Sequence, residues 1–425
     1  MDLSKINFSN VPVNKNVSPK VFREIEKKAS DADKVEISGK AALTSEDNLL
    51  KNAAQVGAAP ASKDAAPAKK KWTILQYSAA DNNLTSAMVD DINDMESVGS
   101  SPETNLVAQL DTGGKEGGRR YFLVKDSDKG KINSPVLQKL GDVNMSDPKV
   151  LADFIKWGMK NYPAEHYMLI LSDHGGGWEG AIQDEGSGGW MSIDDIKQGI
   201  KMAQDETGKK VDVLGFDACL MASTEVGYEL KNQAKYMVAS EETEGADGWP
   251  YTRILTSKTL KNIQNVLRKK IDLPPEELAK KIVRDSESDQ GTISTLSALD
   301  MSKMDTVAKA ADNLAGQIIK TDTSKGILKD IARGTESFNG FKDLYHFAEQ
   351  ITSSDKIKDE ELKKSAQEVV DVLKNTVLAE QHSDKYPNAH GLTVELPSWG
   401  SPSPEYKKTD FAKDTKWEDA LKKLS

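Results

Sequence analysis

Two residues whose types could carry out nucleophilic catalysis each follow an apolar segment of strand length. His174 comes just after residues 167–172, and Cys219, the single cysteine of the chain, comes just after residues 211–216. A thiolate attacks a carbonyl carbon, and a nearby imidazole can take the thiol proton and return it to the leaving amine. Taken alone, such a cysteine is more often an inert buried residue, and such a histidine a hydrogen-bonded loop residue. Their joint placement predicts a divided active site with Cys219 as nucleophile and His174 as base.

Backbone N–H groups beside these two residues could stabilise the negatively charged oxygen of a tetrahedral intermediate. The glycines Gly175 to Gly177 follow the histidine directly. A glycine leaves its N–H unobstructed, although these three could equally make only a tight turn. We expect the N–H groups of Gly175 and Cys219 to form the oxyanion hole. We also expect a helix through Leu230 to begin at Cys219, where its N-terminus would stabilise the thiolate.

Strands and helices alternate along the part of the chain that carries these residues. This alternation predicts an α/β fold, a mostly parallel sheet with helices on both faces. In such sheets ligands bind beyond the carboxyl ends of the strands, where His174 and Cys219 both lie. Ser192 and Asp195 form a capping-box pattern at the start of one helix. The expected strands are 72–77, 105–110, 121–125 (a hairpin at the sheet edge), 167–172, 211–216 and 235–240, and the expected helices include 84–98, one opened by Asp147-Pro148, and 193–205.

The composition changes twice along the chain and predicts three regions. Residues 1–71 are polar and end in an Ala/Pro/Lys-rich stretch, which is typical of a flexible N-terminal segment or a prosegment. Residues 72–255 would form the catalytic core. Residues 256–425 are mostly helical in their periodicity, with strands expected at 292–299 and 391–396 that could extend the same sheet.

Composition and charge exclude several other classes of protein. The chain has 425 residues and a net charge of −10, with no extended basic face, which argues against nucleic acid as a partner. One cysteine rules out an internal disulfide and a cysteine-based zinc cluster, and the five histidines form no H-E-x-x-H pair. No apolar run is long enough for a membrane span, and no signal peptide is visible, so the sequence leaves the localisation unknown.

Several short motifs, in order along the chain, resemble the clostripain family of cysteine peptidases in the caspase-like clan. The histidine and cysteine motifs are specific as a pair, and the others support them. Together they span residues 72–251, with a weaker similarity at 343–345 and 391–397. The motifs are Tyr77-Ser-Ala-Ala-Asp-Asn-Asn-Leu84, Asp111-Thr-Gly-Gly114, Asp173-His-Gly-Gly-Gly-Trp178, Asp217-Ala-Cys-Leu-Met-Ala222, and Val238-Ala-Ser-Glu-Glu242 running on to Gly248-Trp249.

The resemblance implies a caspase-like sheet and cleavage of peptide bonds after Arg or Lys. It also implies a Cys/His dyad with no obligatory third member, which carries over to His174 and Cys219. In the family two aspartates shape an acidic pocket for the side chain before the cleaved bond, here Asp217 and Asp247. A pair of carboxylates in a pocket selects a cation, although Asp247 could also be a turn residue before Gly248. The chain departs from the family in having Gly-Ala-Asp-Gly-Trp at 245–249 in place of Pro-Gly-Asp-Gly-Trp, and in a less aromatic last strand.

The resemblance also bears on metals and processing. No cofactor is required, but some members need Ca²⁺, and the acidic pairs Asp184-Glu185 and Asp126/Asp128 could bind it or could simply be solvated. Members are often exported, and many are zymogens cut at basic residues between the histidine and cysteine motifs. Here residues 175–196 contain no Lys or Arg. We therefore expect any self-cleavage at Lys209-Lys210 or within residues 69–71.

Two other functions compete with an Arg/Lys-specific endopeptidase. One is a caspase-like peptidase that cuts after acidic residues, which would need a basic pocket, whereas the residues flanking Cys219 are acidic or apolar. The other is a non-catalytic binding protein with this fold, tethered by residues 1–71. The presence of both His174 and Cys219 favours the peptidase, whose partners would be proteins or peptides with Arg or Lys at the cleavage position.

Overall fold

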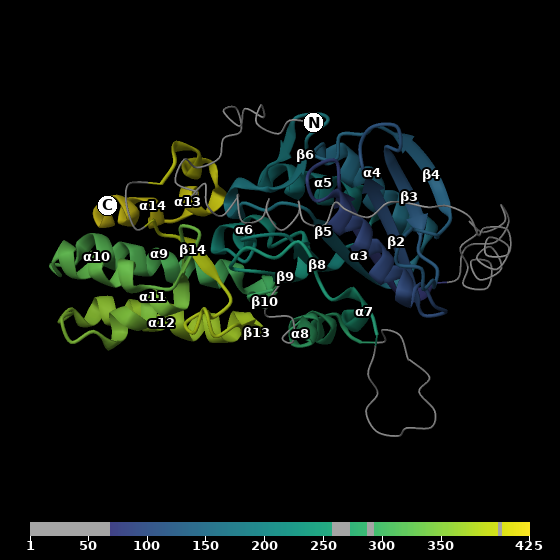
Figure 1. The fold of residues 1–425 in the computed structure, drawn as a ribbon. Coiled ribbons are helices and arrows are strands. Elements are labelled where there is room, and N and C mark those ends of the chain that lie inside the picture. The colour runs from purple at the N-terminus through teal and green to yellow at the C-terminus, as the bar shows by residue number, and fades with distance from the viewer. Residues whose placement is uncertain (1–68, 257–272, 287–292, 398–401) are drawn as a thin grey trace, which may run out of the picture.

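A nine-stranded sheet forms the centre of the computed structural model, which describes residues 69–256, 273–286, 293–397 and 402–425 (Figure 1). The strand order is β13-β10-β9-β8-β5-β1-β2-β3-β4. The five middle strands are parallel: β9 (Ala234–Ala239), β8 (Val211–Asp217), β5 (Ala164–Ser172), β1 (Lys70–Ala79) and β2 (Thr104–Asp111). The outer strands β10 (Thr295–Asp300), β13 (Val377–His382), β3 (Gly118–Phe122) and β4 (Val136–Gly141) run antiparallel to their neighbours. The predicted α/β class with a mostly parallel sheet is confirmed.

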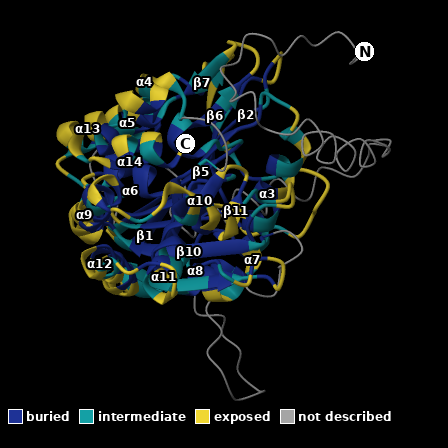
Figure 2. Cartoon of the chain, turned by 90° about the vertical axis from the view of Figure 1, so that its left-hand side faces the viewer, coloured by how far each residue is buried: buried dark blue, intermediate teal, exposed yellow. Residues whose placement is uncertain are grey.

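Helices cover both faces of the sheet because successive strand residues point to opposite sides. In β1, Leu75 and Tyr77 belong to one buried cluster, and Trp72 and Ile74 belong to the other. The first cluster is covered by helices that include α4 (Pro148–Asn161), α5 (Ile193–Thr207), α6 (Thr224–Leu230) and α9 (Met304–Lys320). The second is covered by α3 (Thr85–Val98), α7 (Tyr251–Ile254) and α8 (Pro275–Ser286). In Figure 2 the central strands are mostly dark blue and the outward faces of α9, α12 and α13 are yellow.

The C-terminal region adds a helical layer beside the sheet (green to yellow in Figure 1). Within the described residues this layer holds α10 (Lys325–Gly334), α11 (Leu344–Ser353), α12 (Glu360–Thr376), α13 (Asp410–Asp414) and α14 (Trp417–Leu424). Smaller elements are β6 (Ala181–Asp184), β7 (Gly189–Met191), β11 (Ser337–Phe338), β12 (Phe341–Asp343), β14 (Thr393–Glu395), η2 (Gly177–Glu179), η4 (Met301–Lys303) and η5 (Pro404–Lys408). None of the helices in these described ranges is both long and apolar enough to cross a membrane.

Three strands differ from expectation. The hairpin strand β3 is not at the edge, because β4 pairs outside it; β4 is largely exposed and so has no apolar pattern that would reveal it. Residues 301–380 have mostly helical periodicity, but residues 377–382 form β13, which follows α12 with no Gly or Pro between them. The last strand, β14, pairs with β12 in a separate three-stranded sheet and does not extend the main one. Most of the predicted N-terminal segment, residues 1–68, lies outside the described residues.

The expected helix at Cys219 begins later than predicted. The helix α6 starts at Thr224, and the side chain of Ser223 caps it by accepting a hydrogen bond from the N–H of Val226 at 3.2 Å. Cys219 therefore lies in the loop between β8 and α6. The expectation that a helix N-terminus at Cys219 stabilises the thiolate is wrong, because the effect of a helix end is confined to its first turn.

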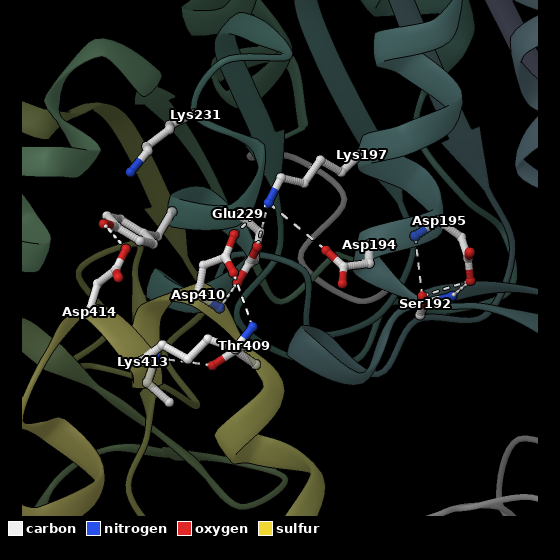
Figure 3. A network of polar contacts seen from close by, with 12 residues as sticks. Ser192, Asp194, Asp195, Lys197, Glu229, Lys231, Thr409, Asp410, Lys413 and Asp414 are labelled. Carbon is white, nitrogen blue, oxygen red and sulfur yellow. Dashed lines mark hydrogen bonds and ion pairs between the residues drawn. The ribbon is translucent and has the colours of Figure 1, made fainter.

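Lys197 joins the C-terminal region to the core through a charged network (Figure 3). Its ammonium group lies 3.0 Å from the carboxylate of Glu229 on α6 and 2.6 Å from that of Asp410 on α13. The same helix, α5, begins with the predicted capping box between Ser192 and Asp195. Lys197 thus makes structural ion pairs and holds α13 against α5 and α6.

Candidate active site

His174 and Cys219 lie just beyond the carboxyl ends of two adjacent parallel strands, β5 and β8. The register pairs Ser172 with Asp217, so both chains leave the sheet at the same level. The backbones beyond them touch: a Cβ added to Gly175 would lie 2.2 Å from the carbonyl oxygen of Cys219. Only a glycine allows this approach. The structure therefore brings together the two strand ends that the sequence predicts to share an active site.

The N–H groups of Gly175 and Cys219 are available to an oxyanion. Neither donates a hydrogen bond to another residue of the described part of the chain. Gly175 faces Ala181 across an isolated bridge, but the hydrogen bonds there are made by its neighbours, from Gly176 N–H to Gly180 at 2.9 Å and from Ile182 N–H to His174 at 3.1 Å. Because a Cβ on Gly175 would also lie 3.0 Å from the nitrogen of Cys219, the two N–H groups belong to one small region.

The thiol of Cys219 contacts the loop that follows β9. The N–H of Glu244 donates to Sγ at 3.3 Å, and Sγ lies 3.9 Å from the carbonyl oxygen of Glu244. Burial raises the pKa of the Cys219 thiol to about 12, the Glu244 N–H lowers it, and the carboxylates of Glu244, Glu242 and Asp217 raise it. The residue after it, Leu220, has a φ of 68°, a left-handed conformation that turns the chain sharply behind the sulfur. At rest Cys219 is therefore a neutral thiol.

His174 is partly exposed and hydrogen bonds to an asparagine that follows β1. Its Nε2 lies 2.8 Å from Oδ1 of Asn83. Burial lowers the pKa of His174 to about 4, so the imidazole is neutral at neutral pH and can accept a proton. Asp81-Asn-Asn83 has the residue types of a helix cap, yet no side chain caps α3. The sequence could have indicated Asn83 as a site residue, because Asn83 follows β1, the parallel neighbour of β5, and ligands bind beyond the carboxyl ends of such strands.

Asp173 fixes the loop that carries His174. Its carboxylate accepts hydrogen bonds from Asn82 Nδ2 at 2.8 Å, from the N–H of Gln183 at 2.5 Å, and from the N–H of His174. Burial raises the pKa of Asp173 well above its usual value. Asp173 therefore has a structural task, which leaves the chemistry at this strand end to His174.

A small cavity of about 60 Å³ lies between Cys219, His174 and the helix α3. Besides Asp173, three acidic residues belong to its wall: Asp217, Glu244 and Asp91. Asp217 is held in place by the hydroxyl of Tyr251 at 2.7 Å and more weakly by the N–H of Trp249 at 3.5 Å. The other predicted pocket residue, Asp247, is exposed on the same loop as Glu244 and is not part of the cavity wall.

The pocket is strongly acidic. Burial raises the pKa of Asp91, Asp217 and Glu244, and the negative charge of Asp217 raises those of Asp91 and Glu244 further. The contact between the carboxyls of Glu244 and Asp217 raises the pKa of Glu244 and lowers that of Asp217. No Lys or Arg of the described ranges forms an ion pair with any of the three. The sequence did not single out Asp91 or Glu244 as site residues.

The acidic residues proposed for Ca²⁺ do not fit a metal site. Within the described residues there is no group of three or more His, Cys, Asp and Glu side chains that could hold a metal ion. The carboxylate of Asp184 accepts the N–H groups of Met145 at 2.7 Å and Ser187 at 2.8 Å. Asp126 accepts the amide of Asn133.

The fold defined by this sheet and site is that of caspase-like cysteine proteases. The structure is similar to a secreted C11 cysteine protease from Bacteroides thetaiotaomicron in complex with an irreversible peptide inhibitor, with a TM-score of 0.61 and 21% identity over 83% of this chain and 99% of that one. An inactive zymogen C11 protease from Parabacteroides distasonis gives a TM-score of 0.59 and 20% identity, over 82% of this chain and 99% of that one. At these identities the similarity shows the fold alone.

The sequence comparisons give the family. The clostripain family model matches residues 76–423, so the chain belongs to the clostripain family of cysteine peptidases. Clostripain of Hathewaya histolytica is 28% identical over 364 residues, which cover 73% of this chain. The chain spans 66% of the length of that protein.

The protonation state of the resting site can be tested with iodoacetamide, a small uncharged electrophile. Because only the thiolate reacts and the pKa of Cys219 is raised to about 12, the alkylation rate should rise about tenfold for each pH unit between pH 7 and 9. Mass spectrometry of quenched samples measures the rate, and Cys219→Ala should remain unlabelled. A rate that is equal at both ends of this range would indicate a preformed thiolate and contradict the assignment.

Proposed function

We propose that the protein is an endopeptidase that cleaves peptide bonds after Arg or Lys through an acyl-enzyme on Cys219. The observation that carries this proposal is the set of buried carboxyl groups beside Cys219, which no cation of the described residues neutralises. A cationic side chain bound there would place the carbonyl carbon that follows it close to the sulfur. The same pocket argues against cleavage after acidic residues, because a carboxylate would be repelled.

In the proposed reaction His174 acts first as base and then as acid. The neutral imidazole takes the thiol proton as Cys219 attacks, and the N–H of Glu244, already 3.3 Å from Sγ, stabilises the developing thiolate. The oxygen of the tetrahedral intermediate accepts the N–H groups of Gly175 and Cys219. His174 then protonates the leaving amine, which leaves a thioester on Cys219. Water, deprotonated by His174, hydrolyses the thioester and restores the thiol.

Asn83 serves as a positioning residue in this scheme. If Nε2–H of His174 donates to Oδ1 of Asn83 across 2.8 Å, the unprotonated Nδ1 is the nitrogen left to act as base. The amide carbonyl also stabilises the imidazolium that forms after proton transfer. The proposed machinery is therefore a triad, whereas the resemblance alone implies a dyad.

The substrate preference is the first part of the function to test. A fluorogenic peptide amide with Arg before the reporter should be hydrolysed, one with Lys also, and one with Asp should not. Cys219→Ala should abolish turnover. Asp217→Asn should raise KM for the Arg substrate by about tenfold or more, because a charge-assisted contact is lost.

The controls separate the competing functions. A melting temperature measured for Asp217→Asn tells a pocket defect from a folding defect, because a structural aspartate would lose stability and activity together. Asp247→Asn, measured alongside, tests whether the exposed aspartate also contributes, which stays a prediction. Binding of an Arg-ketone that does not depend on Cys219, with no turnover of any substrate, would make the protein a non-catalytic binder.

The role of Asn83 predicts a change in kcat and in its pH dependence. Asn83→Ala should lower kcat on the order of tenfold to hundredfold with little change in KM, because His174 loses its orientation. Asn83→Asp places a carboxylate beside the imidazole and should raise the pKa of His174, which shifts the acidic limb of the kcat profile to higher pH. The exposed Asn375→Ala on α12 is the matched control. An unshifted limb in Asn83→Asp would contradict the positioning role.

The basic sites expected for self-cleavage lie far from the active site of their own chain. Lys210 precedes β8 and Cys219 follows it, and at about 3.3 Å per residue roughly 20 Å separate the two ends of this strand. Lys70 begins β1 and pairs with Ala164 at this same amino-end edge of the sheet. The loop after His174 offers no basic alternative, and Lys197 is held in ion pairs.

Any self-processing at these sites should therefore occur between two copies. Intact-mass analysis should show a cleavage half-time that shortens as the protein concentration rises, and an excess of Cys219→Ala protein should be cut by a trace of active enzyme. A half-time independent of concentration would place the cleavage within one chain and contradict the geometry. Identical masses for the active and Cys219→Ala proteins would mean that no self-processing occurs.

A further inference from the structure

Asp91 is a buried carboxylate without a hydrogen-bonding partner in the described part of the chain. It lies on α3, its relative exposure is 6%, and it belongs to the wall of the cavity beside Cys219. The other buried polar residues of this helix are engaged: Asn93 donates to Val89 at 2.9 Å, and Glu96 accepts the N–H of Ser134 at 2.6 Å. Buried carboxylates are rarely left unpaired, because they lose hydration without compensation. The isolation of Asp91 therefore points to a partner that comes from outside the chain.

Glu244 brings a second carboxyl group to the same cavity. The residue is partly exposed, but its Oε2 is buried and accepts no hydrogen bond from an N–H or hydroxyl group of the described residues, while its Oε1 is 3.5 Å from Nε1 of Trp249. Gly248, with a φ of 59°, lets this loop pack against α3, since a Cβ there would lie 2.7 Å from Oδ1 of Asp91. The loop and the helix thus place Asp91 and Glu244 around the space that Asp217 also faces.

We propose that Asp91 is a specificity-determining residue that binds the guanidinium or ammonium group of the residue before the cleaved bond, with Glu244 as a further acceptor beside Asp217. This inference rests on the proposed function and extends it to residues outside the cysteine motif. Asp217 already accepts hydrogen bonds from Tyr251 and Trp249, so its position is fixed but only part of its hydrogen-bonding capacity is left for a substrate. Asp91 is buried and uncommitted, and a guanidinium has enough N–H groups to contact more than one carboxylate.

The charges around Asp91 make cation binding a proton-linked event. The groups that act on it are all acidic: Asp217 from β8, Asp94 and Asp90 from α3, and Asp247 from the loop, and Asp91 in turn acts on Tyr251 of α7 and on Glu244. Burial and these charges raise the pKa of Asp91 well above its usual value. A bound cation favours the ionised carboxylates, so it should displace protons that the empty pocket holds.

Kinetics of Asp91→Asn give the main test. With Arg- and Lys-amide substrates, KM should rise by about tenfold or more, because the substrate cation loses a hydrogen-bond acceptor. The value of kcat should change by less than about threefold, because the substitution leaves the contacts of the reacting atoms in place. Asp90→Asn removes a charge from the exposed neighbouring position of the same helix and should stay within about twofold of wild type. Glu244→Gln should raise KM in the same direction as Asp91→Asn.

Stability and proton release distinguish this role from a structural one. Since the folded-state pKa of Asp91 is raised, its ionisation destabilises the fold as pH rises from its unfolded value, so Asp91→Asn should raise the melting temperature more at pH 8 than at pH 4. If that variant fails to fold, calorimetry of benzamidine binding to the wild-type protein, in buffers of different ionisation enthalpy, still measures how many protons are released when a cation binds. Net proton release on benzamidine binding is expected, and its absence would overturn the inference.

The two proposals fail in different ways. If wild-type protein cleaves neither the Arg nor the Lys substrate, the proposed function fails and the inference falls with it. If wild-type protein cleaves them and Asp91→Asn keeps the KM of Asp90→Asn, the assignment of Asp91 alone is overturned. A loss of melting temperature and kcat together, with KM unchanged, would make Asp91 a structural residue and would also overturn the inference.

Discussion

The contact between the backbones of Gly175 and Cys219 is the constraint on which the rest of the site depends. Parallel pairing of β5 with β8 ends both strands at the same level, and the glycine lets the two loops meet. This single approach sets the position of His174 relative to the thiol and places two unused N–H groups together. A side chain at position 175 would push the loops apart, so one steric fact governs the positions of the base, nucleophile and oxyanion donors.

The C-terminal region braces both of these loops. Beyond the histidine, Nε1 of Trp178 donates to Glu395 of β14 at 3.0 Å. Beyond the cysteine, the N–H of Thr393, also on β14, donates to the carbonyl of Ala222 at 2.9 Å. One short strand therefore contacts both halves of the site. The helices that follow the sheet in sequence thus help to fix the active site as well as enlarge the core.

The sequence predicts the parallel core and the two reactive residues because both depend on local pattern. Apolar runs of strand length that stop at His174 and near Cys219 mark strand ends directly. The position of α6 does not follow from the strand end, because the turn between Cys219 and the Ser223 cap requires a left-handed φ at Leu220. The acidic pocket depends on tertiary contact between α3 and the loop of Glu244, which no spacing reveals. Asp91 in particular has the sequence context of any charged residue on an amphipathic helix.

The resting site carries an excess of negative charge, which connects binding of the substrate cation to ionisation of the Cys219 thiol. Negative charge from Glu244, Glu242 and Asp217 adds to burial in raising the pKa of the Cys219 thiol. Two of these residues are among those proposed to hold the substrate cation. A guanidinium bound there would offset the charge that opposes the thiolate, so the side chain that selects the substrate would also ease the ionisation of the nucleophile. Substrates without that cation would meet a thiol that is harder to ionise, and specificity would then appear in the acylation rate as well as in binding.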